Sequence, residues 1–354
     1  MRKSRSALFS VLWPVGPGDE RRGDSAAYNR FLPVTQRKPK YGPADSMQTP
    51  RFSGIRTYAR VPHVVDELQD VDVAIVGIPF DTGGTFRVGA RFGPEAIRSA
   101  SVLMRPYHGG SGVPIFDLLS VVDFGDLSII PGYFEESAEQ IVKGLAPLHA
   151  AGVVPIALGG DHSIALPELR AAAAVHGPVG LIQLDSHSDT SDAYFGRPYT
   201  HGTPFFHAAK EGLLDARRVI QVGLRGPIYS GHDYEVPRKL GFEVLTAIEV
   251  HELGMNAVAQ RIRERVTGGP VFFSFDIDFV DPAYAPATGT PEIGGFTTWE
   301  VQSLIRRLAG LEYVGFDVVE VIPEYDVAQN TALVAANVAY EFLALLARAR
   351  QSAP

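Results

Sequence analysis

The feature of this chain that most limits its possible folds is a series of apolar runs that alternate with helical stretches. The runs have the length of strands, and several are rich in Val, Ile and Phe; they cover 71–79, 119–124, 153–158, 179–184, 218–224, 242–245, 271–275 and 313–319. Continuous apolar strands are typical of a parallel sheet that is buried on both faces. Helices are predicted between them. One lies within 87–98, with Pro94 just inside its start, and the others cover 135–150, 167–176, 247–266, 297–308 and 328–349. We therefore predict an α/β fold with a mainly parallel central sheet.

The composition supports a large folded core and excludes some chemistries. The chain has 354 residues, of which 45% are hydrophobic, enough for one large domain or two smaller ones. It has no cysteine, which excludes disulfides, thiolate metal sites and a cysteine nucleophile. The lack of cysteine fits a reducing compartment, and we expect a cytoplasmic protein. With a net charge of -8 and no apolar run of membrane-spanning length, we expect neither nucleic acid nor membrane as a partner.

The first fifty residues differ from the rest of the chain. They are rich in Pro, Gly, Arg and Ser, and they contain nine Lys or Arg against four Asp or Glu. We interpret 1–50 as a flexible tail or as an arm that packs on a neighbouring subunit, with a transit peptide as the alternative. The folded domain is then expected at 51–354.

Acidic and histidine side chains follow one of the buried strands at alternate positions. Asp185, His187 and Asp189 come directly after the run 179–184. Residues at i, i+2 and i+4 of an extended chain point the same way, so these three side chains can converge. Two carboxylates this close would repel each other unless a cation lay between them. The alternative is a solvated polar turn.

The same pattern returns at other predicted strand ends. Asp276 and Asp278 follow 271–275, His162 follows 153–158 and Glu320 follows 313–319. In parallel sheets, ligands bind outside the carboxyl ends of the strands. Two divalent ions that share carboxylates would use all six metal-competent side chains, which are His162, Asp185, His187, Asp189, Asp276 and Asp278. Oxygen and nitrogen ligands suit Mn²⁺, and a pair of such ions activates water, so the pattern indicates metal-assisted hydrolysis.

Three sequence blocks resemble the signatures of the ureohydrolase family, which includes arginase and agmatinase. They are GGDHS at 159–163, DSHSDT at 185–190 and SFDIDFVDP at 274–282. Further agreement comes from GARFGPEAIR at 89–98, HGTPF at 201–205, PATGTPEIGG at 286–295 and DVVEV at 317–321. The resemblance implies a three-layer α/β/α arginase-like fold, a catalytic domain at 51–354 and two Mn²⁺ ions per subunit, with Ni²⁺ as the alternative. It also implies a homotrimer or homohexamer.

By position, the resemblance divides the metal ligands between two ions. One ion would take His162, Asp185, Asp189 and Asp276, and the other would take Asp185, His187, Asp276 and Asp278. Asp185 and Asp276 would then bridge the ions. The chain departs from the usual second block at Ser186, where Ala is common, but a small hydroxyl should not remove a ligand.

The family reaction is hydrolysis of a guanidinium group to urea and an amine by a metal-bridging hydroxide. The resemblance implies that Asp278 orients the hydroxide, that Glu320 pairs with the guanidinium and that His201 moves a proton to the leaving amine. A carboxylate matches the forked donors of a guanidinium, and imidazole can transfer protons near neutral pH. Each residue also has a structural alternative. His201 would instead make a hydrogen bond that holds its loop in place, and Glu320 would instead supply a negative charge behind the metal ligands.

The substrate is less sharply indicated. The blocks HGTPF and GTPEIGG resemble those of agmatinase and the guanidino-acid hydrolases more than those of arginase. We expect agmatine as the substrate, with 4-guanidinobutyrate, 3-guanidinopropionate and free guanidine as alternatives. Glu324 would suit a cationic tail, whereas Arg197, in the loop 194–197, would attract a carboxylate. Two other classes stay open: a non-catalytic metal-binding regulatory protein on the same scaffold, and a deacetylase-like hydrolase with a single zinc ion. The complete ligand set argues against the regulatory protein.

Overall fold

The computed structural model describes residues 38–352, which lie within one compact unit, Gln36–Pro354. Its centre is a sheet of eight strands in the order β4-β1-β5-β10-β9-β6-β7-β8, and all neighbouring strands are parallel. The strands are β1 (Val73–Ile78), β4 (Val121–Asp126), β5 (Val154–Gly159), β6 (Val179–Leu184), β7 (Leu214–Leu224), β8 (Glu243–Thr246), β9 (Val271–Asp276) and β10 (Tyr313–Val319). A separate antiparallel hairpin consists of β2 (Tyr107–His108) and β3 (Val113–Pro114).

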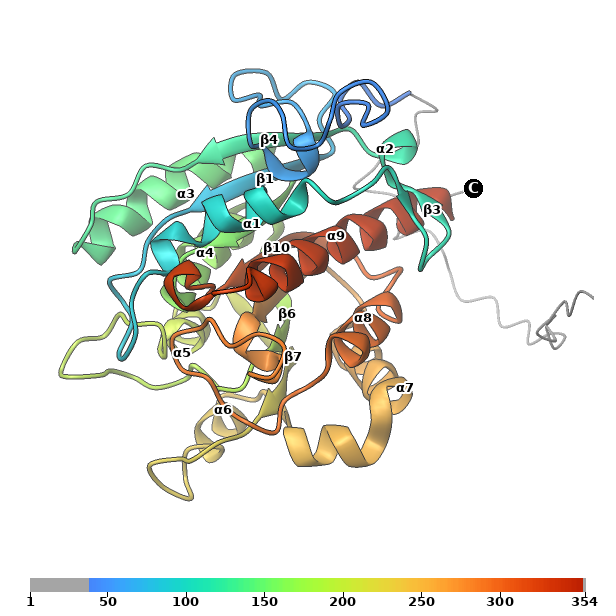
Figure 1. Ribbon diagram of the computed structural model, residues 1–354. Coiled ribbons are helices and arrows are strands. Elements are labelled where there is room, and N and C mark those ends of the chain that lie inside the picture. The colour runs from blue at the N-terminus through green and yellow to red at the C-terminus, as the bar shows by residue number, and fades with distance from the viewer. Residues whose placement is uncertain (1–37, 353–354) are drawn as a thin grey trace, which may run out of the picture. The chain divides into compact units, whose positions relative to one another are not determined.

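Helices cover both faces of the sheet (Figure 1). They are α1 (Gly93–Ser101), α2 (Ile115–Leu118), α3 (Phe134–Ala150), α4 (Ala165–His176), α5 (Pro204–Lys210), α6 (Glu235–Lys239), α7 (Ala247–Val266), α8 (Thr298–Arg306) and α9 (Asn330–Gln351). Apolar residues of α1, α7, α8 and α9 pack on one face, and those of α3, α4 and α5 pack on the other. This three-layer arrangement confirms the predicted fold class.

Alternation along the strands supplies both halves of the core. In β9, Phe272 packs with the α4 and α5 side while Phe273 packs with the α8 and α9 side. Both side chains are at most 2% exposed. Successive side chains of a strand point to opposite faces, so a strand buried on both sides must be apolar throughout. The continuous apolar runs of the sequence therefore become the centre of the sheet.

Local capping accounts for two helix starts. The Thr246 hydroxyl accepts a hydrogen bond from the Glu249 N–H at the start of α7, and the Glu249 carboxylate accepts from the Thr246 N–H. Thr297 and Glu300 repeat this exchange at α8. Each exchange satisfies donors that a helix start would otherwise leave free.

The helix predicted within 87–98 is α1, which begins at Gly93 with Pro94 in its first turn, as expected. A 3₁₀ turn at Ala90–Phe92 precedes it, and Gly89 has φ 124°. The hairpin β2–β3 and the short helices α2 and α5 were not predicted. Strands of two residues and helices of four to seven are too short to show a periodic pattern.

The helix α9 corrects the expectation that no apolar run reaches membrane-spanning length. By length and composition alone it is long and apolar enough to cross a membrane, but 67% of that apolar stretch is buried inside the molecule. Its residues pack with α1, α8 and β10 in the core. This burial is what a core helix shows.

Residues 38–50, which the sequence assigned to the N-terminal extension, make contacts with the folded domain. The Tyr41 N–H donates to the Ser120 hydroxyl at 3.0 Å, and the Ala44 N–H donates to the Arg60 carbonyl at 3.2 Å. The Lys40 ammonium pairs with Glu67 at 2.8 Å. The expectation for residues 1–37 lies outside the described residues and stays a prediction.

Candidate metal centre and substrate cavity

Four adjacent strands bring the predicted site residues to one edge of the sheet. The strands β5, β10, β9 and β6 are consecutive in the sheet, although they are far apart in the sequence. His162 follows β5, Glu320 follows β10, Asp276 ends β9 and Asp185 follows β6. Because these strands are parallel, their carboxyl ends meet at the same edge. The structure thus confirms that these four residues lie at neighbouring strand ends.

A tight backbone approach sets the position of His162. The Gly160 N–H donates to the Ile78 carbonyl, and a Cβ atom on Gly160 would lie 1.7 Å from the Phe80 carbonyl oxygen. Only glycine fits there. The next residue, Asp161, donates its N–H to Phe80, and its carboxylate accepts from the Gly83 N–H at 2.6 Å. The GGDHS block therefore joins the end of β5 to the loop that follows β1.

The ring of His162 faces three carboxylates. Its Nδ1 lies 3.1 Å from Asp185, 2.8 Å from Asp189 and 3.3 Å from Asp276. None of these contacts has hydrogen-bond geometry, so Nδ1 is a buried atom with no hydrogen-bond partner among the described residues. On the other side of the ring, Nε2 lies 2.8 Å from the Ser274 hydroxyl. A nitrogen that points at several carboxylate oxygens without bonding to any is arranged as a metal ligand.

A second cluster surrounds His187. Its Nδ1 lies 3.0 Å from Asp278 Oδ2 and 3.7 Å from Asp185 Oδ1. That Asp278 oxygen is also buried without a hydrogen-bond partner in the described chain, whereas Asp278 Oδ1 accepts from the Ser186 N–H at 3.0 Å. The Ser186 hydroxyl lies 3.1 Å from His187 Nδ1, so this departure from the usual block sits beside a predicted ligand.

Repulsion among the carboxylates shows in their pKa values. Burial raises the pKa of Asp185 to about 7, and the charges of Asp189 and Asp278 add to the rise. Burial, together with Asp278 and Asp185, raises the pKa of Asp276 well above its usual range. Burial acts on Asp278 in the same direction, but His187 outweighs it and the pKa of Asp278 falls below its usual range. Acidic groups that hinder one another's ionisation indicate a place that a cation would stabilise.

The geometry offers two ligand sets that share a carboxylate. One set is His162, Asp185 and Asp276, and the other is Asp185, His187 and Asp278; the ligand atoms within each set lie within 4.8 Å of one another. Asp189 adjoins the first set through its contact with His162. The donors are imidazole and carboxylate without sulfur, as Mn²⁺ prefers. Together with the orphaned atoms of His162 and Asp278, this donor set fits a pair of divalent ions.

His201 and Glu320 lie together beside the clusters. His201 Nδ1 is 2.9 Å from Glu320 Oε1, which also accepts the His162 N–H at 2.9 Å. Burial lowers the pKa of His201, but Glu320 outweighs burial and raises it to about 9. On its far side, His201 Nε2 lies 2.7 Å from the Thr85 hydroxyl. Thr85 was not among the predicted site residues.

Asp189 and Glu320 have backbone angles that are rare for residues other than glycine. Asp189 has φ 51° and Glu320 has φ 65°, both in the left-handed region. Such conformations are uncommon outside glycine and collect at functional sites, where the surrounding structure enforces them. The Glu320 N–H is held by the Gly160 carbonyl at 2.9 Å.

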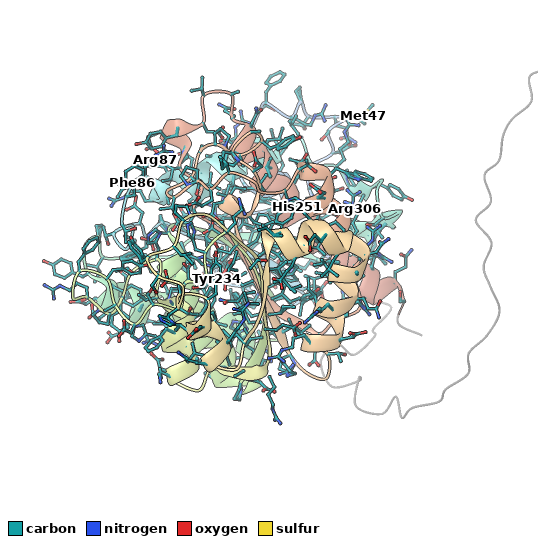
Figure 2. The ribbon with its side chains drawn as sticks, turned by 90° about the horizontal axis from the view of Figure 1, so that it is seen from below. Met47, Phe86, Arg87, Tyr234, His251 and Arg306 are labelled. Carbon is teal, nitrogen blue, oxygen red and sulfur yellow. The ribbon has the colours of Figure 1, made fainter. Side chains whose placement is uncertain are left out.

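A cavity of about 870 Å³ opens onto these residues. Its lining includes His187, Asp189, His201, Asp276 and Thr85, and further out Tyr194, Phe206, Arg225, Tyr229, Tyr234 and Glu292. Figure 2 labels Tyr234, one of these lining residues. Arg197 and Glu324, which the sequence placed at the substrate, are both exposed and are not part of the lining.

The structure places those two residues elsewhere for local reasons. Arg197 closes a two-residue turn, in which its N–H donates to the Tyr194 carbonyl at 2.8 Å. Glu324 lies in the 3₁₀ turn Pro323–Tyr325 and points towards Gly89. Exposed loop side chains follow the turn that carries them, and sequence spacing does not show their direction.

A row of buried polar residues inside the strands was missed by sequence reasoning. Gln183 in β6 donates to the Asp185 carboxylate at 2.8 Å, and Gln221 in β7 donates to Gln183. Ser274 in β9 joins His162 to Asp317 in β10, whose Oδ1 accepts from the Ser274 hydroxyl at 2.9 Å. Buried polar groups need partners, so a polar residue inside an apolar strand was the available signal.

The fold and the site define a metal-dependent hydrolase with a parallel α/β/α core. The chain belongs to the Arginase family, whose model matches residues 71–345. Enzymes of this family use a binuclear metal centre, and the family together with the relatives below shows that the protein is an amidinohydrolase.

Known proteins of this family match nearly the whole described chain. The chain is 46% identical to a guanidinobutyrase of Pseudomonas aeruginosa, over 86% of this chain and 96% of that relative. It is 45% identical to a mitochondrial agmatinase of Gallus gallus, over 83% of this chain and 86% of the relative. The solved structure of proclavaminate amidino hydrolase from Streptomyces clavuligerus matches with a TM-score of 0.81 and 42% identity, over 85% of this chain and 100% of that one. These matches confirm the arginase-like fold.

Proposed function

We propose that this enzyme hydrolyses agmatine to putrescine and urea with the help of two Mn²⁺ ions. The observation that carries the choice of substrate is the charge of the cavity. Apart from the ligand clusters, its lining contains the carboxylates Asp192, Asp233 and Glu292. Among the described lining residues, Arg225 is the only Lys or Arg. An acidic cavity favours a substrate with a positive charge at each end.

Arg225, the one Lys or Arg among the described lining residues, already makes hydrogen bonds within the protein. The Arg225 guanidinium donates to the carbonyl oxygens of Glu292, Asp278 and Gly223, with the shortest contact at 2.5 Å. Burial lowers its pKa, although the surrounding carboxylates oppose this. Asp233 is likewise occupied, because it accepts from the Tyr229 N–H and the Ser230 hydroxyl. Glu292 lies nearest the ligand clusters by its contact of 4.0 Å with His187 Nε2, and we assign it to the cationic tail.

We assign the metal ligands as the resemblance implies. His162, Asp185, Asp189 and Asp276 would hold one ion, and Asp185, His187, Asp276 and Asp278 would hold the other. The shared position of Asp185 in both ligand sets supports a bridging role. Bound there, the two ions would lower the pKa of a water molecule and supply hydroxide near neutral pH.

The chain's own residues would then bind the guanidinium and handle the proton. Glu320 is 2% exposed and presents a carboxylate that the His162 N–H and His201 hold in place. A guanidinium pairs well with such a fixed carboxylate. His201 lines the cavity and can give a proton to the leaving amine. Asp278 is positioned by the Ser186 and His187 contacts to accept a proton from the attacking water.

A guanidino acid is the second candidate substrate. The guanidinobutyrase match and the agmatinase match differ by about one percentage point, at 46% and 45% identity. Arg225 would be the partner for the carboxylate of 4-guanidinobutyrate or 3-guanidinopropionate if it released its carbonyl contacts. This alternative requires the acidic lining to tolerate a further negative charge.

The test is urea release by Mn²⁺-loaded protein from agmatine, 4-guanidinobutyrate, 3-guanidinopropionate, L-arginine and guanidine. We expect agmatine to give the highest kcat/KM, and the same protein after chelation serves as the control. A higher kcat/KM with a guanidino acid would replace agmatine by the second candidate. If no guanidine compound gave urea, the proposed reaction itself would be wrong. Light scattering would test the expected homotrimer or homohexamer.

A further inference from the structure

The segment 83–85 holds His201 at two points. The His201 N–H donates to the Gly83 carbonyl at 3.0 Å. At the ring, Nε2 lies 3.2 Å from the Thr85 backbone nitrogen and 2.7 Å from the Thr85 hydroxyl. The segment is itself anchored, because Asp161 accepts the Gly83 N–H at 2.6 Å. Asp161 is 1% exposed, so this anchor lies in the interior.

The backbone contact of Thr85 decides which nitrogen of His201 accepts. A backbone N–H can only donate, so Nε2 must offer its lone pair to it. A neutral imidazole has one donor and one acceptor nitrogen. The proton of the neutral ring therefore lies on Nδ1, which faces the Glu320 carboxylate at 2.9 Å. A carboxylate accepts that proton as a charge-assisted hydrogen bond.

The Thr85 hydroxyl differs from the backbone N–H in that it can serve both protonation states. It donates to Nε2 of the neutral ring, and after rotation it can accept from Nε2–H of the charged ring. The N–H cannot make this change and opposes a proton on Nε2. Among the contacts of the described residues, Nε2 has no hydrogen-bond partner other than Thr85.

The chain turns outward immediately after Thr85. Thr85 and His201 both line the cavity, whereas Phe86 is 71% exposed. The Arg87 guanidinium stacks on the Tyr325 ring at 4.6 Å, and Figure 2 labels Phe86 and Arg87 at the outside of the molecule. Thr85 is thus the last residue before this outward turn, and its side chain lies against the His201 ring.

We propose that Thr85 is a positioning residue for His201: its N–H keeps Nε2 as the acceptor, so that the neutral ring holds its proton on Nδ1 against Glu320, and its hydroxyl orients the ring in both protonation states. The ring is then oriented to take up and release a proton at Nε2. This inference rests on the proposed function, in which His201 supplies a proton to the leaving amine. It assigns to Thr85 a part in the reaction that neither motif spacing nor the ligand clusters indicated.

The experiment compares Thr85→Val, which removes the hydroxyl at nearly constant volume, with Thr85→Ser, which keeps it. Thr82→Val is the matched control, because Thr82 is exposed in the same loop and does not line the cavity. We expect Thr85→Val to lower kcat by about 10- to 100-fold, a part of the usual contribution of a general acid, with KM changed by less than about threefold. Thr85→Ser should restore kcat to within about threefold of the wild type, and Thr82→Val should match the wild type.

A double-mutant cycle separates positioning from a general structural role. In a His201→Gln background, Thr85→Val should change kcat by less than about twofold, because its partner ring is already gone. An equal loss in both backgrounds, or full activity of Thr85→Val alone, would overturn the proposal.

A neutron structure of the metal-loaded protein provides a readout that does not need activity. In crystals held above the pKa of His201, it should show a deuteron on Nδ1 and none on Nε2. A deuteron on Nε2 with Nδ1 bare would overturn the proposal even in an active enzyme. If the wild type released no urea from any guanidine, the proposed function would fail, and the neutron structure would still decide the Thr85 assignment.

Discussion

Two buried histidines in different regions of the molecule have opposite surroundings. His162, at the carboxyl edge of the sheet, is 1% exposed and faces three carboxylates at 2.8–3.3 Å. His149, in the last turn of α3, is 2% exposed and packs edge-on against His176 at 5.4 Å. Neither ring nitrogen of His149 has a hydrogen-bond partner within residues 38–352.

The two rings therefore respond to burial in opposite ways. Burial lowers the pKa of His149 to about 4, and His176 adds to this effect. Burial also lowers the pKa of His162, but Asp185, Asp189 and Asp276 outweigh it and raise the value well above the usual range. The exposed fraction is nearly equal, so neighbours alone make the difference. A buried histidine marks a site only where charged partners converge on it.

The largest expected effect on activity comes from replacing His162, the histidine that faces the carboxylates. We expect His162→Asn to lose bound metal and to lower kcat/KM for urea release by about 1000-fold or more, since a metal contributes several kcal/mol to catalysis and about 1.4 kcal/mol is tenfold. Metal analysis and a urea assay measure both. His149→Phe is the matched control and should keep its metal and its activity. Wild-type metal content in His162→Asn would contradict the ligand assignment.

The second test concerns stability in acid. His149 has a lower pKa in the folded state than its ordinary 6.5, so the unfolded state binds more protons and folding stability falls as the pH drops through about 6.5 towards about 4. Between about pH 7 and pH 5 this loss amounts to about 2 kcal/mol. His149→Phe should show a smaller loss than the wild type by about that amount. Urea unfolding at both pH values measures it, and the metal contribution cancels in the comparison. An equal loss in both proteins would show that His149 is not the titrating group.

Replacing Glu292 is expected to change KM for agmatine by about tenfold. Glu292→Gln removes the carboxylate that we assign to the ammonium group of agmatine, and KM for agmatine should rise by about tenfold, equivalent to about 1.4 kcal/mol. KM for 4-guanidinobutyrate should stay the same or fall, because a negative charge leaves the cavity. Steady-state kinetics with both substrates measure the change. A rise in KM for both substrates alike would argue against a role for Glu292 in choosing the tail.

The smallest effects are expected for the two exposed residues that the sequence had placed at the substrate. Arg197→Gln and Glu324→Gln should each change kcat/KM by less than about twofold, because screened surface charges contribute little. The same urea assay applies, with Glu292→Gln as the comparison within the cavity. A tenfold effect of either substitution would return that residue to the substrate site.

Much of the site could be predicted because it follows from local rules. The strands are visible in the sequence as apolar runs. Asp185, Asp276 and Glu320 each follow directly after one of these runs. The carboxyl-edge rule for parallel sheets then places such residues near one another. Gln183, Ser274 and Asp317 broke the apolar pattern, and that signal was available but unused. Arg197 and Glu324 could not be placed, because nothing in a loop sequence gives the direction of an exposed side chain.

By itself, the sequence determined the strands, the polar residues at their ends and the blocks that indicate a two-metal hydrolase. Periodicity and residue chemistry carry that information over short distances. Only the tertiary structure decided that β5, β10, β9 and β6 lie side by side in that order. It also brought Thr85 to His201 across 116 positions and His201 to Glu320 across 119. Those contacts arise from the packing of distant loops, and no local pattern contains them.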